Sequence, residues 1–246
     1  SDEHEMIHSV FELGDTLVRE LMVPRTDMVW VEKDKTLRQG LSLALRSGYS
    51  RIPVIGDSID NIVGIVYVKD LAKRVLDHHE AEQSETIEKH MRPANFVPEI
   101  KMADDLLKEM QKNQIHLAIV VDEYGGTAGI ITIEDIIEEI VGEIEDEFDD
   151  AEEEFIWLSE DKARARASLH IEDLADELKL DIEKSDYEDI DSVGGLMAQK
   201  LGRVPIAGST ISWEGWAITS ERPLGRRRRI SSVLVERLEE EIEDAE

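Results

Sequence analysis

Hydrophobic and polar positions follow two periods along this chain, and the elements they predict occur twice in the same order. The first copy contains the apolar stretch DMVWV from Asp27, the helically spaced TLRQGLSLALRSG and the compact run RIPVI from Arg51. The second copy contains NFVPEI from Asn95, MADDLLKEMQKN and HLAIVV from His116. A period near 3.6 predicts a helix, and a short apolar run predicts a buried strand. Each copy is therefore predicted to be strand, helix, strand.

The predicted helices should each bury one face. We expect that face to hold Leu37, Leu41 and Leu45 in the first copy. The corresponding residues in the second copy are Leu106, Leu107 and Met110.

A turn and a strand that runs into an acidic helix complete each copy. The turns are GDSIDN and DEYGG, and the Gly125-Gly126 pair is typical of a tight hairpin. The strands begin GIVYVKDL at Gly64 and GIITIEDI at Gly129, 65 residues apart. The sequence thus predicts a tandem β-α-β-β-α repeat over residues 16–146, with repeats at about 16–77 and 86–146.

Each repeat alone is too small to bury much core, so we expect the two to pack around a pseudo-two-fold axis. Two sheets edged by helix N-termini would then enclose a cleft suited to an anionic ligand.

The chain after the second repeat predicts a helix, a linker and a further domain. A helical apolar stripe at Ile136, Ile137, Ile140, Val141 and Ile144 extends to about Glu145, and residues 147–154 are predicted to be an acidic linker. Residues 155–240 predict strands at 155–158 and 163–169, two helices, the second ending at Gly202, and three closing strands, TISW, GWAITS and RISSVLVERL. The whole chain is predicted to have an α+β fold.

Composition excludes several classes of protein. There are 57 acidic and 28 basic residues, a net charge of −29, so the surface should repel nucleic acid. The chain has no cysteine, which excludes disulfides, thiolate metal sites and a cysteine nucleophile. No apolar run approaches the length that spans a membrane. The motifs GxxxxGK[ST], GxSxG and HExxH are all missing, so we expect no enzyme.

Three weaker motifs are interpreted conservatively. Residues 77–80, DHHE, resemble a metal cluster but are predicted to be a solvated loop. Residues 186–191 lack the glycine that a calcium loop needs. Residues 226–229 are all arginine and could touch anionic lipid or a transporter, or pair with local acids.

Five stretches together resemble a known family over nearly the whole chain. They are VFELGDTLVRELMVPRTDM, SGYSRIPVI, NIVGIVYVKDL, VVDEYGGTAGIITIEDIIEEIVGEIEDE and DSVGGLMAQKLGRVPIAGSTI. The repeat resembles a tandem pair of CBS domains, a Bateman module. The sequence of these stretches is similar to the CorC/HlyC branch, the bacterial relatives of the CNNM magnesium transporters. Residues 155–240 resemble the transporter-associated domain of that branch.

The resemblance implies a CBS pair that binds ATP with Mg²⁺, forms homodimers and regulates magnesium efflux, with cobalt as a second ion. Many members carry a membrane-spanning domain before the segment at which this sequence starts. We therefore expect residues 1–15 to be a linker or helix from such a domain, which this sequence lacks. The partner would be that domain, in the same full-length chain or as a separate subunit. The module would act at the cytoplasmic face of a bacterial cell membrane.

The last motif of repeat two offers groups that could hold a nucleotide. Thr132 should end the strand and Asp135 should lie on the first helical turn. A carboxylate there can accept hydrogen bonds from ribose hydroxyls, and the threonine hydroxyl can donate to a phosphate. Phosphate oxygens would be the main ligands of Mg²⁺, and Glu134 could help to hold the ion through water. Alternatively, these residues only cap the helix. The resemblance favours nucleotide binding.

Repeat one departs from this motif, because Tyr67 and Lys69 replace Thr132 and Glu134 and a bulky ring should crowd the phosphate position. Arg51 is a permanent cation suited to phosphate, with a surface ion pair as the alternative. We therefore predict one good nucleotide site per chain and one degenerate site.

The resemblance implies that the segment around Arg51 faces the motif of repeat two. Ile52 and Pro53 would then contact the adenine, and Arg51 or Ser50 the phosphates. Tyr49 and, as a weaker candidate for the adenine edge, Thr26 would complete the site. Two other functions stay open: a sensor of another adenylate, such as AMP or a dinucleotide, and a purely structural dimerisation module.

Overall fold

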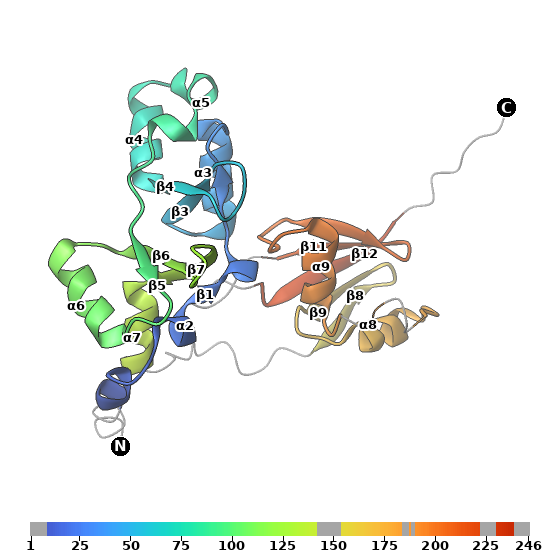
Figure 1. Ribbon diagram of the computed structural model, residues 1–246. Helices are drawn as coiled ribbons and strands as arrows, with labels where there is room; N and C mark the ends of the chain where they lie inside the picture. The colour runs from blue at the N-terminus through green and yellow to red at the C-terminus, as the bar shows by residue number, and fades with distance from the viewer. Residues whose placement is uncertain (1–8, 142–153, 184–186, 188–189, 222–229, 239–246) are drawn as a thin grey trace. The chain divides into compact units, whose positions relative to one another are not determined.

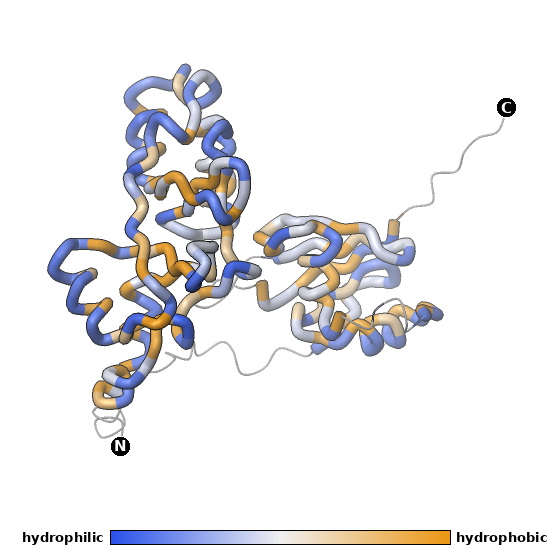
Figure 2. Tube along the Cα trace, in the orientation of Figure 1, coloured by the Kyte–Doolittle hydropathy of each residue, from blue (hydrophilic) through white to orange (hydrophobic). Residues whose placement is uncertain are grey.

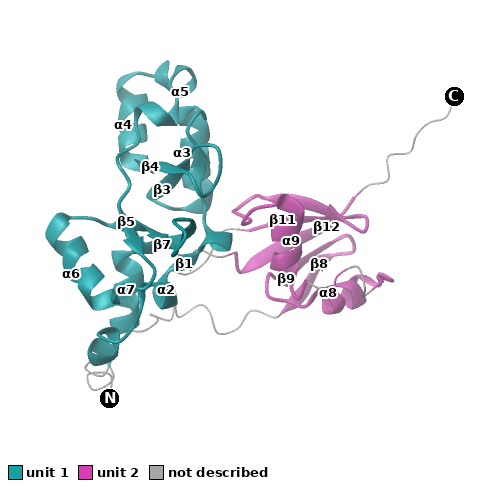
Figure 3. Cartoon of the chain, in the orientation of Figure 1, with its two compact units in different colours: residues 1–145 teal, residues 146–246 magenta. Residues whose placement is uncertain are grey.

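The computed structural model describes residues 9–141, 154–183, 187, 190–221 and 230–238. The chain divides into two compact units, residues 1–145 and 146–246 (Figure 3). The residues outside the described ranges include the acidic stretch 142–153, residues 186, 188 and 189 of the 186–191 motif, and the four arginines at 226–229. Among the described helices, none has the length and apolar character needed to cross a bilayer.

Repeat one forms a three-stranded sheet with its helices around it (Figure 1). Its elements are β2 (Val31–Glu32), α3 (Leu37–Ser47), β3 (Arg51–Ile55), β4 (Ile62–Tyr67) and α4 (Val68–Asp77), followed by α5 (Ala81–Ser84) and η2 (Ile87–Lys89). The strand order is β2-β3-β4, with β2 parallel to β3 and β3 antiparallel to β4. α3 begins at a capping box, in which Thr36 and Gln39 satisfy each other's backbone N–H groups.

Repeat two has the same order of elements, so the predicted β-α-β-β-α unit is confirmed in both copies. Its elements are β5 (Phe96–Pro98), α6 (Ala103–Asn113), β6 (Leu117–Val121), β7 (Thr127–Thr132) and α7 (Ile133–Val141). The β6–β7 hairpin turns at Gly125, whose φ of 81° favours glycine. The sheet order is β1-β7-β6-β5, and its first strand comes from elsewhere in the chain.

Each repeat receives backbone from the segment that precedes the other. β1 (Val23–Pro24), which lies between α2 (Val18–Leu21) and η1 (Arg25–Asp27), pairs with β7. Reciprocally, Arg92 forms an isolated bridge with Ile65 of β4. The crossing chain passes so close that a Cβ on Gly129 would collide with the Val23 carbonyl, and one on Gly64 would lie 2.8 Å from the Arg92 carbonyl. Only glycine leaves room for these two crossings.

The two repeats also share a core. The buried cluster that joins them contains residues of both sheets: Met28, Ile55, Ile62 and Ile65 from repeat one, and Leu117, Ile119 and Ile130 from repeat two. Two further clusters lie between each sheet and its own helices. In Figure 2, hydrophobic residues are concentrated in the strands of this unit, whereas its helices alternate between hydrophobic and hydrophilic residues. The repeats therefore complete one another, as their small size requires.

The predicted helix faces are partly corrected. In α3, Leu37 and Ala44 are buried, whereas Leu45 is 80% exposed. Residues spaced by four advance by about 40° more than a full turn at each step, so the third leucine has rotated off the buried face.

The other two helices differ in how well the prediction held. In α6, Leu106 and Met110 are buried as predicted. In α7, Ile136 is buried while Ile137 and Val141 are 37% and 45% exposed, so its apolar stripe is wider than its buried face.

In its described residues, the second unit contains a five-stranded antiparallel sheet and two helices. Its elements are β8 (Phe155–Ser159), β9 (Lys162–Arg166), α8 (Ile171–Leu178), α9 (Val193–Leu201), β10 (Thr210–Trp213), β11 (Trp216–Ser220) and β12 (Ser232–Arg237), in the order β10-β11-β12-β9-β8. α9 ends at Gly202 with a φ of 64°, as predicted. Trp213 and Trp216 face each other across the β10–β11 hairpin and are buried. The predicted α+β fold class is confirmed.

Candidate functional site

Thr132 and Asp135 cap the junction between β7 and α7 reciprocally. The Thr132 backbone N–H and its hydroxyl each donate to Asp135 Oδ2 at 2.7 Å, and the Asp135 N–H donates to Thr132 Oγ1 at 3.2 Å. The capping interpretation is therefore realised in the structure. It uses only one carboxylate oxygen, because no described group donates to Asp135 Oδ1. The second oxygen stays available to a ligand's hydroxyl groups.

The electrostatic environment of Asp135 is unfavourable for its charge. Burial raises the pKa of the carboxyl, the two hydrogen bonds from Thr132 lower it, and the charges of Glu138 and Glu134 raise it again. Additional hydrogen-bond donors would stabilise the carboxylate at this position. Ribose hydroxyls are donors of that kind.

Arg51 is the residue of repeat one that reaches the motif of repeat two. It begins β3 opposite Tyr67, and its Nη1 lies 3.8 Å from Glu134 Oε1. The side chain is 24% exposed, and its Nε is buried without a hydrogen-bond partner. Glu134 is 60% exposed, so this long ion pair is a weak reason for the arginine's position. A buried guanidinium N–H without a partner is suited to an anion.

The other residues of the Arg51 segment are placed differently from one another. Ser50 is exposed, and its carbonyl accepts a hydrogen bond from Val68 N at 3.0 Å, which ties the segment to α4. Tyr49 is half-buried against the helix-side core of repeat one. Pro53 is buried, and Ile52 is only 1% exposed within that core. The strand turns Ile52 toward the helices, and its contact with adenine stays a prediction, as does that of Pro53.

Thr26 lies in η1 and is exposed, with its hydroxyl 3.4 Å from Asp27 Oδ1. Since β1 runs antiparallel to β7, Thr26 lies toward the start of β7, whereas Thr132 is the last residue of that strand. No hydrogen bond in the described residues joins Thr26 to Thr132 or Asp135.

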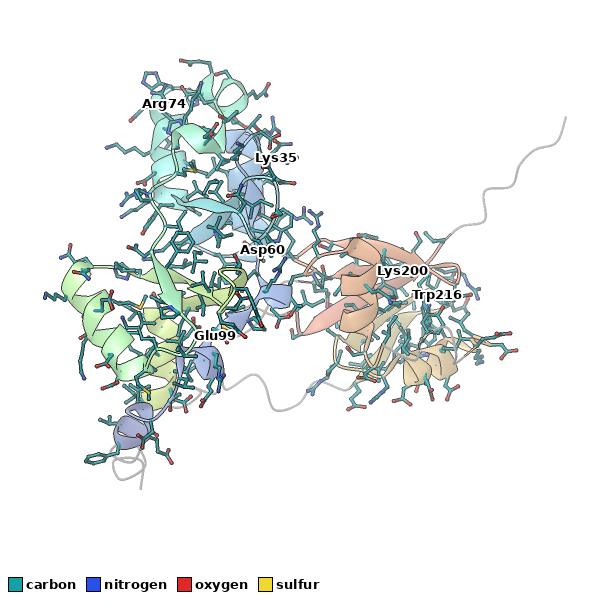
Figure 4. The ribbon with its side chains drawn as sticks, in the orientation of Figure 1. Lys35, Asp60, Arg74, Glu99, Lys200 and Trp216 are labelled. Atoms are coloured by element: carbon teal, nitrogen blue, oxygen red, sulfur yellow. The ribbon has the colours of Figure 1, made fainter. Side chains whose placement is uncertain are left out.

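An inter-repeat cluster that the sequence did not predict lies beside Thr26. Arg25 donates two hydrogen bonds to Asp60, at 2.5 and 2.9 Å, and Asp60 also accepts from Thr127 N at 3.0 Å. The hydrogen bonds from Arg25 and Thr127 lower the pKa of Asp60. Figure 4 labels Asp60, which lies on the loop between β3 and β4. This cluster ties η1 and both hairpins together.

The corresponding motif of repeat one is closed by its own side chains. Arg92 stacks on the Tyr67 ring at 4.2 Å from the ring centroid and donates to both oxygens of Asp70, at 2.8 and 2.9 Å. Asp70 matches Asp135 in the repeat, and both of its oxygens are taken. Arg92 was not among the residues predicted from the sequence, because its contacts with Tyr67 and Asp70 join segments far apart in the chain.

The described residues contain no cluster of three or more side chains able to hold a metal ion. In the 77–80 loop, His78 Nδ1 lies 3.7 Å from Glu80, and both side chains are exposed. Near Arg51 there is an exposed carboxylate, that of Glu134. This donor set fits a Mg²⁺ ion carried mainly by phosphate oxygens, with Glu134 as a water-mediated ligand.

Protein families match both units of the chain. The CBS domain matches residues 18–77 and 87–142, and the transporter associated domain matches residues 158–239.

Curated proteins match nearly the full length. A UPF0053 protein of Mycobacterium tuberculosis is 48% identical over 231 residues, which cover 94% of this chain and 53% of that protein. The magnesium and cobalt efflux protein CorC of Salmonella typhimurium is 40% identical over 216 residues, which cover 87% of this chain and 72% of CorC. The chain thus spans about half the length of the mycobacterial relative.

Solved structures match the first unit. The CBS domain of the bacterial CNNM/CorC family Mg²⁺ transporter has a TM-score of 0.55 and 50% identity, covering 59% of this chain and 87% of that one. A second structure of that CBS domain, in complex with ATP, has a TM-score of 0.55 and 49% identity, covering 58% of this chain and 100% of that one.

Proposed function

Because this chain belongs to the family of the CorC magnesium and cobalt efflux proteins, with a CBS pair followed by a transporter associated domain, we propose that it is the cytoplasmic regulatory module of a magnesium efflux transporter. In this proposal it binds ATP with Mg²⁺ between its CBS repeats. Cobalt is a second candidate for the transported ion.

The observation that carries the proposal is the meeting of Arg51 with the Thr132–Asp135 motif. A cation from repeat one lies 3.8 Å from Glu134, next to a carboxylate of repeat two that keeps one oxygen free. A ligand with hydroxyls at one end and phosphates at the other matches this pair of groups. The related CBS domain solved in complex with ATP supports the adenylate as that ligand.

Each residue has a distinct part in the proposed binding. Asp135 Oδ1 accepts hydrogen bonds from the ribose hydroxyls, and the Thr132 hydroxyl turns to donate to a phosphate. Arg51 binds phosphate oxygens through its fork of N–H groups. Mg²⁺ offsets the charge of the phosphates near a protein of net charge −29. The remaining candidates for contacts with the base or phosphates are Thr26, Tyr49, Ser50, Ile52 and Pro53.

The proposed regulation is a population shift in a homodimer of CBS modules. ATP joins groups of both repeats, so it favours the arrangement in which they lie close together. The N-terminal segment can pass this geometry to a membrane-spanning domain, because it is hydrogen-bonded to repeat two. Val18 N donates to the Lys101 carbonyl at 2.9 Å, and Ala103 N donates to the Thr16 carbonyl at 2.8 Å.

The test is Asp135→Ala in the full-length transporter. We expect the variant to lose ATP binding and with it the dependence of magnesium transport on ATP. Asp105→Ala is the matched control, because Asp105 is an exposed acid on α6 whose ion-pair partner is Lys108 and not a residue of the motif. If the folded Asp135→Ala protein binds no ATP yet transports as the wild type does, the proposed coupling is wrong. A folded wild-type chain that binds no adenylate would instead indicate a structural dimerisation module.

A further inference from the structure

Three cations surround one aromatic ring in repeat one. The Tyr67 ring centroid lies 4.2 Å from the Arg92 guanidinium carbon, 5.6 Å from that of Arg51 and 5.9 Å from Lys69 Nζ. The chain has a net charge of −29, but acidic residues dispersed over its surface do not explain why three cations gather at one place. The ring supports each cation by a cation–π contact.

The three cations differ in how they are balanced. Arg92 is neutralised, because it forms a two-point ion pair with Asp70. Arg51 has only the 3.8 Å contact with Glu134 and keeps its buried Nε without a hydrogen bond. Lys69 is exposed, and no described carboxylate lies within ion-pair distance of its ammonium group. Arg51 and Lys69 therefore form the part of the group that has charge to offer a ligand.

Lys69 also occupies an electrostatically poor position in its own helix. It is the second residue of α4, where the helix dipole favours an acid, and repeat two has Glu134 at the matching position. In addition, α4 has no side-chain cap, whereas Thr132 and Asp135 cap α7. A residue that breaks a local rule without compensation points to function. Asp70, the acid in the first turn of α4, is already paired with Arg92, so it does not balance the charge of Lys69.

Arg51 connects this position to the proposed nucleotide site. It pairs in register with Tyr67 on one side and approaches Glu134 on the other. A nucleotide whose ribose is held at Asp135 would extend its phosphates along Arg51 toward Lys69. A single phosphate would reach Arg51, whereas a longer chain of phosphates would also reach Lys69.

We propose that Lys69 is the residue that selects a nucleoside triphosphate over a monophosphate, by binding the terminal phosphates beside the Tyr67 ring. This inference rests on the proposed function and deepens it. Arg92 closes the motif of repeat one to a second nucleotide. In this proposal, the same motif contributes Lys69 to the site of repeat two.

The experiment compares Lys69→Gln with Lys73→Gln, which removes the same charge from an exposed position one turn further along α4. Calorimetric titrations in Mg²⁺ measure Kd for ATP and for AMP with each protein. We expect Lys69→Gln to weaken ATP binding about tenfold and AMP binding less than about twofold, since it removes a hydrogen bond between charged groups. Lys73→Gln should leave the ratio of the two Kd values unchanged, and Lys69→Arg should restore it.

The outcomes separate this inference from the function on which it rests. If the wild type binds ATP and Lys69→Gln keeps the same ratio as Lys73→Gln, the role of Lys69 is wrong while ATP binding stands. A wild type that prefers AMP to ATP would also overturn it. If the folded wild type binds neither nucleotide, the proposed function and this inference both fail.

Discussion

Two aspartates at matching positions of the repeat have different hydrogen-bond partners. Asp70 has both oxygens engaged by Arg92, so it holds the crossing chain against repeat one. Asp135 has one oxygen engaged by Thr132 and a pKa raised chiefly by burial. The aspartate of this motif therefore has both oxygens hydrogen-bonded in repeat one and one oxygen available in repeat two.

Asp135→Asn should separate ligand binding from stability. The asparagine oxygen can still accept both hydrogen bonds from Thr132, and the variant removes a buried charge. Because burial raises the folded-state pKa of Asp135, its ionisation destabilises the native state above that pKa. We expect a thermal midpoint at or above that of the wild type, with ATP binding weakened roughly tenfold or more. Thermal unfolding with and without ATP measures both effects.

Asp70→Asn is the matched control for that comparison. It should lower the thermal midpoint, because it breaks the pair with Arg92, and leave ATP affinity near the wild-type value. A stronger loss of ATP binding in Asp70→Asn than in Asp135→Asn would assign the nucleotide to repeat one.

The environment of Glu85 indicates how the stability of repeat one depends on pH. It accepts hydrogen bonds from Arg74 Nε at 3.0 Å and from Arg74 Nη2, and its Oε2 lies 2.5 Å from His90 Nε2. The hydrogen bonds from Arg74 contribute most to lowering the pKa of Glu85 from 4.5 to about 2. The native state is therefore stabilised by this carboxylate above pH 4.5, and the contribution is lost as the pH falls toward 2. Figure 4 labels Arg74 on α4.

We expect Glu85→Gln to be less stable than the wild type at neutral pH and to lose less stability than the wild type between pH 4.5 and 2. Urea unfolding at several pH values measures the difference. Glu88→Gln is the control, because Glu88 is exposed on the neighbouring η2. Parallel pH curves for wild type and Glu85→Gln would show that this cluster does not set acid stability.

At the scale of elements, the crossing segments explain why the two repeats behave as one body. β1 belongs in sequence to repeat one but pairs with β7, and Arg92 reciprocates at β4. The two glycines that admit these crossings face different obstacles. At Gly129 a side chain would meet the Val23 backbone, whereas at Gly64 it would meet the Arg92 carbonyl and the flexible Met91 side chain.

Gly129→Ala should therefore destabilise the first unit by at least about 2 kcal/mol, because backbone must move to admit the methyl group. Gly64→Ala should cost less, since its closest approach to the crossing backbone is 2.8 Å. Chemical denaturation of both variants measures the order. Equal stability of Gly129→Ala and wild type would contradict the pairing of β1 with β7.

Sequence patterns predicted the elements well and their pairing less well. Strands, helices and the Gly202 cap of α9 follow from local spacing and turn residues, which the structure keeps. The exchange of β1 could not be predicted, because a two-residue strand has no periodicity. The exposed position of Leu45 was missed because the i+4 spacing was extended over too many turns.

Some residues of the candidate site could be predicted from local sequence patterns, and others could not. Thr132 and Asp135 follow from the position of a strand end and a first helical turn. Arg92, Asp60 and the approach of Arg51 to Glu134 depend on contacts between repeats, which no local pattern records. Strand alternation directs Ile52 into the core, and its predicted contact with adenine stays a prediction.

At the scale of the whole molecule, the net charge of −29 decides how ATP can bind. The chain repels free ATP, and Arg51 and Lys69 offer only local attraction. We expect ATP affinity to fall roughly tenfold or more when EDTA replaces Mg²⁺, because an ion on the phosphates reduces the repulsion. AMP, with fewer charges, should change much less. Equal ATP affinity in Mg²⁺ and EDTA would count against binding as the magnesium complex.

The central claim is that one motif of the pair binds ATP and the other is closed by Arg92. Calorimetric titration of the wild-type chain with ATP in Mg²⁺ measures the stoichiometry directly. We expect saturable binding at one ATP per chain, abolished by Asp135→Ala in protein that remains folded. Two ATP per chain, or binding that survives Asp135→Ala, would contradict it.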